Sequence, residues 1–323
     1  MYRRDSAARS VSNCGARAAV GFVRAARGAL LAGQRGLALV AVLWMVAALT
    51  VTASGVVYAV RSELRSVASF REMAVAGALG EAGIVVASRE LAASTERDGR
   101  LKRFEVTIEQ VAVHLRVVPL TGLIDLNAAE EPLLADLLVV AGRLERPRAV
   151  SLAQRIIDWR DADDQARPEG AENSTYAAAG SPFRTRGGPF EAPEDLLQVV
   201  GVDFDLYGRL RPLITVHLRG GGRVDPAAAP PEVLRVLASG NEQIAAEYAS
   251  AREANGALAD TTRFPAAYIT RSQPSRFLLE ASVPLGNGAF MVTRSVVDLS
   301  AARGGAPWRT LWAERIVEPA PAA

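Results

Sequence analysis

The densest group of side chains that could do chemistry lies between residues 158 and 172. Six carboxylates fall within these fifteen residues, together with two arginines: Asp158, Asp161, Asp163, Asp164, Glu169 and Glu172, with Arg160 and Arg167. Carboxylates at this density repel one another unless water solvates them or a cation binds them, and hard oxygen atoms suit Ca²⁺. The spacing is not that of an EF-hand loop, because the third donor and the terminal glutamate are out of register. The residues alone leave two interpretations open, a calcium site and a solvated loop that caps a helix.

Few other side chains are suited to catalysis. The two histidines, His114 and His217, lie 103 residues apart, and the chain has neither a Gly-x-Ser-x-Gly sequence nor a Walker loop. His114 falls in an alternating segment, where a single histidine is more often a strand residue than a ligand. Because only carboxylates remain, we expect no enzyme, and a membrane-anchored carboxylate or calcium-dependent hydrolase stays as an alternative.

The elements that must position the acidic run begin with an apolar helix. Residues 36–60 contain no charged side chain, and Arg35 and Arg61 stand at the two ends. About 20 apolar residues are enough to cross a bilayer core of about 30 Å. We therefore expect a transmembrane helix rather than a buried core helix.

The flank of this helix predicts its orientation. Residues 1–35 carry seven arginines against one acid, Asp5. Basic flanks stay in the cytoplasm, so everything after Val60 should cross the membrane. A cleavable secretory signal also starts with basic residues, but its apolar core is shorter, at about 7–15 residues.

Charge and cysteine usage divide the chain in the same way. The formal charge of the whole chain is +2, but the residues after Gly36 hold 30 basic and 34 acidic side chains. The basic balance therefore belongs to the N-terminal segment and does not indicate nucleic-acid binding. The only cysteine, Cys14, lies in that segment, so the exported part has no disulfide or thiolate metal site.

Patterns after the membrane segment predict a helix, two β-hairpins and a helical block between them. Helical periodicity continues from Arg61 and should break near residues 93–99. Residues 104–108 and 111–117 alternate as one hairpin, and residues 277–285 and 289–299 as another, with a strand at residues 308–317 completing the sheet. The intervening 140 residues are mainly helical in pattern.

One element occurs twice within the helical block, at an offset of 100 residues. Residues 122–138 match residues 222–237, so that Asp125 corresponds to Asp225 and Leu134 to Leu234. In each copy a short extended segment ends in a polar cap and leads into an apolar helix, with proline tolerated in the first turn. Asn127 has Ala227 as its counterpart, so the second cap should be weaker.

Several ordered motifs together resemble a known family. The sequence from Gln34 to Val40, QRGLALV, resembles a type IV prepilin-type leader, which a peptidase cuts after the glycine. Most such proteins have glutamate at the fifth position after the cut, whereas this chain has Ala41, which is typical of the K-type minor pseudopilin of type II secretion, the GspK family. The doubled element, residues 152–176 (with DWRDADD and GAE) and residues 187–202 (with GPF) are also similar to K-type segments.

The resemblance implies an α+β fold. A pilin-like N-terminal helix, half transmembrane and half soluble, should pack on an antiparallel sheet, with a large all-α domain inserted between strands. The implied segments are the following: leader 1–36, transmembrane half 37–60, first part of the pilin-like domain 61–121, inserted helical domain 122–266, final strands 267–318 and tail 319–323.

The resemblance also implies a function. Such a protein caps the tip of the periplasmic pseudopilus and supports export across the outer membrane, after cleavage between Gly36 and Leu37 and methylation of the new N-terminus. Implied partners are pseudopilins I and J, the major pseudopilin, the prepilin peptidase and the inner membrane, with the N-terminus cytoplasmic and the C-terminal domain periplasmic. The family binds calcium in its helical domain, which makes Asp161, Asp163 and Glu172 the first candidate ligands and Asp158 and Asp164 the next.

A second resemblance competes for the helical block. Parts of residues 125–129 and 188–202 are also similar to helix-hairpin-helix modules of DNA-uptake membrane proteins, which bind phosphates through backbone N–H groups of a Gly-x-Gly hairpin. Here the sequence is Gly201-Val202-Asp203, so that Asp203 takes the place of the second glycine. The other hairpin has only Gly142. Because the region is acidic where phosphate would lie, we expect no nucleic-acid binding.

Overall fold

The computed structural model describes residues 34–94, 99–218, 220–300 and 307–319. The predicted leader up to residue 33 and most of the predicted tail lie outside these ranges. The chain divides into two compact units, residues up to Arg71 and residues from Glu72 onward. Each unit is described by itself.

The described part of the first unit is helical. Helix α2 (Gln34–Ala93) starts there, contains no proline and extends into the second unit. Its large apolar side chains between Leu39 and Phe70 are exposed, as expected for a helix that needs lipid or partner helices around it. By length and composition, α2 is able to cross a membrane.

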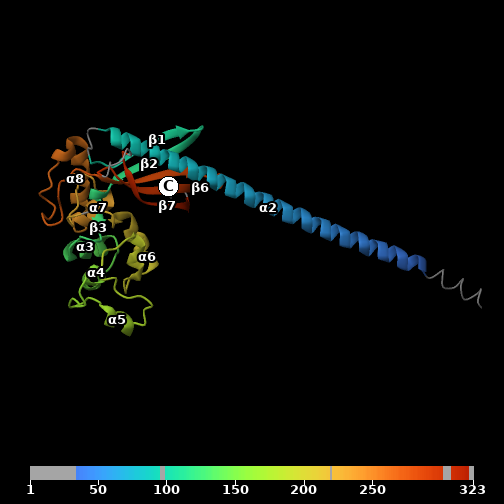
Figure 1. Cartoon of the computed structure of the whole chain (residues 1–323), viewed down its shortest axis with the longest axis horizontal. Coiled ribbons are helices and arrows are strands. Elements are labelled where there is room, and N and C mark those ends of the chain that lie inside the picture. The colour runs from blue at the N-terminus through green and yellow to red at the C-terminus, as the bar shows by residue number, and fades with distance from the viewer. Residues whose placement is uncertain (1–33, 95–98, 219, 301–306, 320–323) are drawn as a thin grey trace, which may run out of the picture. The chain divides into compact units, whose positions relative to one another are not determined.

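The second unit contains a five-stranded antiparallel sheet (Figure 1). Its strand order is β1-β2-β5-β6-β7, from β1 (Lys102–Ile108), β2 (Val111–Pro119), β5 (Arg276–Pro284), β6 (Ala289–Asp298) and β7 (Arg309–Pro319). Glu109 and Gln110 turn the first hairpin with φ of 49° and 68°, and Asn287 and Gly288 turn the second. The predicted hairpins and last strand are therefore present, within two residues of their expected ends.

The C-terminal part of α2 covers one face of this sheet. Ala76, Leu79, Ile84, Ala87 and Leu91 recur at helical spacing and pack against buried strand residues such as Val113, Leu279 and Ala281. The lone His114 lies at the surface of β2, with its Nδ1 atom 3.3 Å from Glu105 Oε2 on β1. The predicted packing of helix on sheet is thus confirmed.

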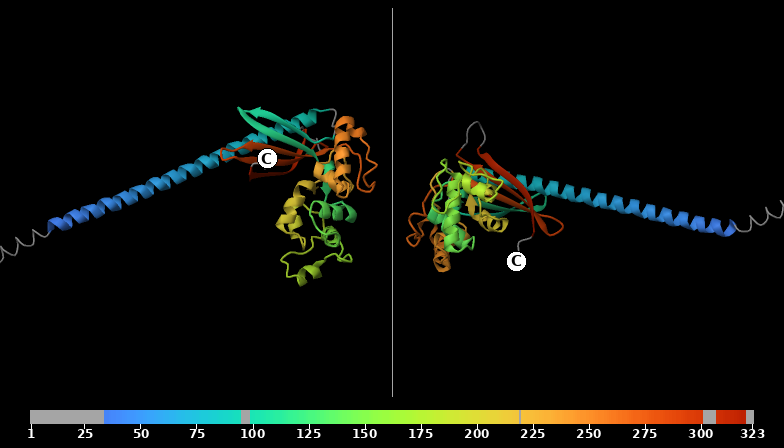
Figure 2. Two further views of the ribbon diagram at one scale, coloured as in Figure 1. Left: turned by 180° about the vertical axis from the view of Figure 1, so that it is seen from behind. Right: turned by 90° about the horizontal axis from the view of Figure 1, so that it is seen from below.

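The helical segment is inserted between β2 and β5, two strands that pair with each other. Its elements in chain order are η1 (Leu120–Gly122), β3 (Ile124–Asp125), α3 (Glu131–Val140), α4 (Arg146–Arg160), α5 (Asn173–Ala178), η2 (Pro193–Gln198), α6 (Phe204–Leu210), η3 (Arg211–Leu213), β4 (Ile214–Thr215), α7 (Pro231–Leu237), α8 (Glu242–Asn255) and η4 (Gly256–Leu258). In Figures 1 and 2 these elements gather at one end of the sheet. The predicted α+β fold with a helical insertion is confirmed.

One feature of the insertion was not predicted. Strands β3 and β4 pair in parallel, with Ile124 opposite Ile214, and the backbone N–H of Leu126 donates to the carbonyl of Thr215 at 2.9 Å. Val224 forms a matching single bridge with Ile269. Both copies of the repeated element are therefore held by short parallel pairings inside an otherwise helical core.

Candidate functional site

Helix α4 places the start of the acidic run. It buries Ala149, Leu152, Ala153 and Ile156 against the insertion core, so its last turn is fixed in position. Trp159 is 1% exposed and stacks on Phe190, with ring centroids 4.2 Å apart. The helix ends at Arg160, and Asp161 is the first residue of the loop that returns to α5.

Asp158 organises this loop from inside the protein. Its side chain is fully buried, and Oδ2 accepts hydrogen bonds from the backbone N–H groups of Arg167 at 3.1 Å and Ala171 at 3.0 Å. The Arg167 guanidinium also donates to Asp158 Oδ1 at 2.6 Å. With these donors in place, Asp158 stabilises the loop instead of presenting free oxygens at its surface.

Three other carboxylates converge beside Asp158. Asp161, Asp163 and Glu172 each offer one oxygen, and these oxygens all lie within 4.8 Å of one another. Arg167 donates to Asp161 Oδ2 at 2.7 Å and offsets part of their charge. The loop therefore brings together the three first candidate ligands that the sequence suggested.

Glu172 is the most unusual member of this group. It is 3% exposed, and neither of its side-chain oxygens has a hydrogen-bond partner of normal geometry, which also holds for the buried Oδ1 of Asp161. Burial raises the pKa of Glu172 to about 6, and the nearby Thr185 side chain offsets part of that rise. Buried carboxylate oxygens without donors are the arrangement that a hard cation would satisfy.

The remaining acids of the run are not part of this group. Asp164 Oδ1 accepts from Asn173 Nδ2 at 3.4 Å, and Glu169 is exposed, with its backbone N–H donating to Gln154 Oε1 at 2.8 Å. Asp164 and Glu169 thus lie along the loop without joining the three converging carboxylates. Tyr176, predicted to pack around the loop, is fully buried, and its hydroxyl accepts from the backbone N–H of Val200 at 3.3 Å.

The repeated element forms two similar turns. In the first copy Asp125 Oδ1 accepts from the backbone N–H of Asn127 at 2.9 Å, and in the second Asp225 Oδ1 accepts from that of Ala227 at the same distance. The turn is therefore kept in the second copy despite the loss of the asparagine, because the aspartate side chain forms it. The predicted polar cap on the helix after each turn is wrong, since the N-cap residues of α3 and α7, Glu130 and Pro230, make no side-chain cap hydrogen bond.

An arginine from a later helix completes each turn. Arg160 donates to the carbonyls of Leu126 and Ala129, the latter at 2.7 Å. Arg252 of α8 donates to the carbonyls of Pro226, at 2.9 Å, and Ala229, at 2.7 Å. These contacts were not predicted, since nothing in the local pattern shows that an arginine 23 to 34 residues away will reach the turn.

The two copies also pack against each other through their first glycines. A Cβ atom on Gly122 would lie 2.3 Å from the carbonyl oxygen of Ala228, and one on Gly222 would lie 2.0 Å from that of Ala128. The contact is reciprocal, so each glycine lets the other copy's turn approach to backbone distance. The repeat detected in the sequence is thus a pair of mutually packed turns.

The buried position of Asp125 in the first turn disfavours its charged form. It is 3% exposed, and its Oδ2 atom is buried without a hydrogen-bond partner. Burial raises its pKa from the ordinary 3.8 to about 6, although the backbone N–H of Asn127 and the charge of Arg160 oppose this shift. Burial also raises the pKa of Asp225.

The positions that resemble a helix-hairpin-helix module are used for capping. Asp203 is the N-cap of α6 and accepts from the backbone N–H of Leu206 at 2.7 Å. The carbonyl of Gly142 accepts from Arg209 at 3.1 Å. A carboxylate therefore occupies the helix start where such modules would need free N–H groups for a phosphate.

Part of the insertion matches the model of a known family. Residues 122–218 match the family described as "Type II secretion system (T2SS), protein K". The K-type resemblance is confirmed over this segment. It contains the first repeated turn, the acidic loop and its three converging carboxylates.

One curated relative matches in sequence, and one solved structure matches in fold. A "Type II secretion system protein K" from Pectobacterium carotovorum subsp. carotovorum is 39% identical over 70 residues, which are 22% of this chain and 21% of that protein. The match thus spans about a fifth of the length of the curated relative. A crystal structure of the GspK-GspI-GspJ complex from the type 2 secretion system of enterotoxigenic Escherichia coli aligns with a TM-score of 0.57 at 18% identity, covering 78% of this chain and 99% of that one. At this identity the alignment shows that the two chains share a fold.

Proposed function

We propose that this chain is a K-type minor pseudopilin that caps the tip of the periplasmic pseudopilus in type II secretion. The observation that carries the proposal is the position of the segment that matches protein K, inserted between paired strands of a sheet packed on the long helix. The shared fold with a chain of the GspK-GspI-GspJ complex supports it. Among the described residues we find no grouping that favours an enzyme or a DNA-binding module.

The proposed subunit is held in the inner membrane before assembly. Helix α2 supplies the anchor, since its exposed apolar side chains and its length suit a bilayer. The arginine-rich flank keeps the N-terminus in the cytoplasm, which places the folded unit from Glu72 onward in the periplasm. A prepilin peptidase would cut between Gly36 and Leu37 and leave α2 in place.

We propose pseudopilins I and J as the partners at the tip. The related chain in the solved complex is assembled with GspI and GspJ. Ala41 stands where other pseudopilins carry the glutamate that pairs with the N-terminal amine of the neighbouring subunit, so this chain lacks a group for a subunit above it. The bulky insertion at the end of the sheet also suits a capping position.

Processing gives a direct test of the proposed leader. The membrane-extracted wild-type chain should start at Leu37, and Gly36→Leu should remain uncut because the peptidase needs a small residue before the cleaved bond. Gly55→Leu is the matched control, since Gly55 lies in the same helix with no other group within 4 Å of an added Cβ. N-terminal sequencing identifies the first residue of the wild type and of both variants. Normal cleavage of the Gly36 variant would refute the leader assignment.

We further propose that the acidic loop binds calcium through Asp161, Asp163 and Glu172. The support is the convergence of three oxygens within 4.8 Å and the burial of both Glu172 oxygens without a hydrogen bond of normal geometry. When bound, the ion would supply the positive charge that the buried carboxylates lack and fix the loop between α4 and α5. Asp158 would hold the loop through Arg167 and Ala171 rather than touch the ion.

Thermal unfolding tests this proposal. Saturating calcium should stabilise the wild-type chain, by about 2.7 kcal/mol at 100 times Kd. Glu172→Gln should raise the melting temperature without calcium, because it removes a buried charge, and should lose most of the calcium increment. Glu169→Gln, an exposed change in the same loop, should behave as wild type. Equal calcium increments in all three proteins would argue against the site.

A further inference from the structure

The two repeated turns share a framework but differ in the charge around them. In each copy an acidic residue directly follows the arginine that donates to the turn, Asp161 after Arg160 and Glu253 after Arg252. Beside the first turn, Asp161 faces two more carboxylates. Beside the second turn, Glu253 faces arginines instead.

The first turn is covered by the protein itself. The side-chain amide of Asn127 donates to the carbonyls of Phe190, at 2.9 Å, and Val216, at 3.1 Å, and its Oδ1 accepts from the backbone N–H of Phe190 at 2.7 Å. One asparagine thus binds both the backbone N–H and the backbone carbonyl of Phe190. The chain segment around Phe190 is thereby held against the turn.

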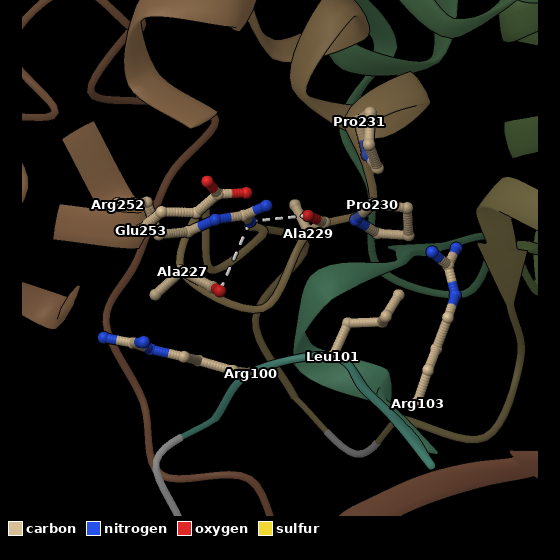
Figure 3. A pocket seen from close by; sticks show the side chains of 9 residues that line it. All are labelled: Arg100, Leu101, Arg103, Ala227, Ala229, Pro230, Pro231, Arg252 and Glu253. Atoms are coloured by element: carbon tan, nitrogen blue, oxygen red, sulfur yellow. Dashed lines mark hydrogen bonds between the residues drawn. The ribbon is translucent and has the colours of Figure 1, made fainter. Parts of the chain in front are cut away.

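Among the described residues, no side chain covers the second turn in the way that Asn127 covers the first. Its counterpart of Asn127 is Ala227, which lines a cavity of about 310 Å³ (Figure 3). Three arginines and one acid lie around this cavity, in the set Arg100, Leu101, Arg103, Ala227, Ala229, Pro230, Pro231, Arg252 and Glu253. The space is large enough for a short side chain with part of its backbone, and its charge is positive.

Two arginines of this cavity, Arg100 and Arg252, contact the end of α8 or the second turn. Gly256 ends α8 with φ of 61°, and a Cβ atom there would lie 2.3 Å from Arg100 Nη2, so the guanidinium of Arg100 rests on the end of that helix. Burial lowers the pKa of Arg252, and the charge of Arg100 lowers it further. In Figure 3 Arg100 and Arg103 extend to opposite sides of Leu101. With three arginines and one glutamate in its lining, the cavity is electropositive.

We propose that the cavity at the second turn binds a carboxylate of an extended acidic peptide segment. Guanidinium groups match carboxylates in both charge and hydrogen-bonding geometry. An extended segment suits the site, because the equivalent side of the first turn is covered by the peptide backbone at Phe190. The repeated turns would then serve opposite purposes, with cation binding beside one and anion binding beside the other.

Peptide binding to the full chain in detergent tests this proposal. The probes are a blocked hexapeptide of alternating alanine and glutamate, the same peptide with glutamine in place of glutamate, and succinate. Calorimetry in buffers passed over a chelating resin, with no soluble chelator left in them, keeps calcium out of the acidic loop without adding a competing carboxylate. The glutamate peptide should bind, and the glutamine peptide should bind at least about tenfold more weakly, because it loses charge-assisted hydrogen bonds.

Two variants separate charge from space. Arg103→Gln removes one exposed charge of β1 and should weaken binding of the glutamate peptide about tenfold. Ala227→Leu keeps every charge but fills the cavity. It should also weaken binding of the glutamate peptide. Arg184→Gln, an exposed arginine elsewhere, is the control and should change nothing. Circular dichroism melting curves of the variants verify that they are folded.

The peptide-binding results either support or overturn the proposed carboxylate site. Loss of binding in both cavity variants but not in the control supports the proposal. Equal binding of the glutamate and glutamine peptides, or no effect of Arg103→Gln, would overturn it. If succinate binds as tightly as the peptide, the site takes free small carboxylic acids, and the assignment to a peptide segment is overturned.

Discussion

Buried carboxylates show how single residues determine the site. Asp158, with three donors around it, holds the loop together, whereas Asp125 and Glu172 each keep at least one buried oxygen without a donor. A carboxylate that lacks donors in a buried position favours its protonated form, and so its pKa rises. A carboxylate therefore stabilises the fold at one position and favours the binding of a proton or a cation at another.

Asp125 should make stability depend on pH. Its pKa is about 6 in the folded protein against 3.8 ordinarily, so the folded state binds more protons than the unfolded chain between these values. The free energy of unfolding should therefore fall as pH rises from about 4 through about 6, by up to about 3 kcal/mol for this group. Urea unfolding of the wild type and of Asp125→Asn across this range measures the difference.

The variant is chosen so that the turn survives. An asparagine can still accept from the backbone N–H of residue 127 while it no longer titrates. The slope between pH 4 and 6 should be smaller in Asp125→Asn than in wild type, with Glu172 accounting for part of what remains. Asp205→Asn, at an exposed position of α6, should leave the slope unchanged. An identical slope in wild type and Asp125→Asn would contradict the account.

At this scale the sequence revealed residue types but not their partners. Asp161, Asp163 and Glu172 could be grouped because they are close in the chain and match a family motif. The same closeness suggested Asp158 and Asp164, yet the helix end turns Asp158 inward to Arg167 and Ala171. Asn127 reaches Phe190 across 63 residues, and contacts of that span depend on tertiary packing that no local pattern encodes.

At the scale of elements, the repeated turns are the centre of the insertion. Each combines an aspartate that accepts from the backbone of its own turn, an arginine donor and a glycine contact with the other copy. These contacts satisfy backbone carbonyls that would otherwise be buried without donors. The acidic loop and the arginine-lined cavity both depend on this framework, because Arg160 and Arg252 belong to it.

The two glycine contacts predict a pair of matched variants. Gly122→Ala and Gly222→Ala would each force a Cβ atom against a backbone carbonyl of the other copy. Each should lower the free energy of unfolding by about 3 kcal/mol or more, since backbone cannot move aside as a flexible side chain can. Chemical denaturation of the two variants measures this loss.

Gly208→Ala is the control for the glycine pair. Gly208 lies inside α6 with no other group within 4 Å of an added Cβ. The same substitution should therefore stabilise the protein there, by about 0.5–1 kcal/mol, because alanine favours helix more than glycine does. If Gly122→Ala and Gly222→Ala did not lower the free energy of unfolding relative to the wild type, the two turns would not pack against each other as described.

Most elements could be predicted because their signals are local. The long helix, both hairpins and the last strand follow from periodicity and turn residues, and the observed ends lie close to the expected ones. The parallel pairs of Ile124 with Ile214 and of Val224 with Ile269 could not be predicted. They involve one or two residues on each side, which is too short for an alternating pattern to appear.

At the scale of the whole molecule, the second unit joins two kinds of core. The sheet packs on α2 through one set of buried residues, and the insertion has its own core that also contains Val118 and Val296 from the sheet. Arg211 of the insertion pairs with Glu314 of β7. The insertion is thereby joined to the end of the sheet, which suits a subunit whose head blocks further stacking.

We propose that this subunit sits at the tip of the pseudopilus with pseudopilins I and J. The most direct measurement is affinity purification of the full-length, tagged chain from detergent-solubilised membranes of cells that also produce I, J and the major pseudopilin. We predict that I and J are recovered with the chain in equal amounts and that the major pseudopilin is recovered only through them. Recovery of the chain without I and J, or of the major pseudopilin in their absence, would contradict the account.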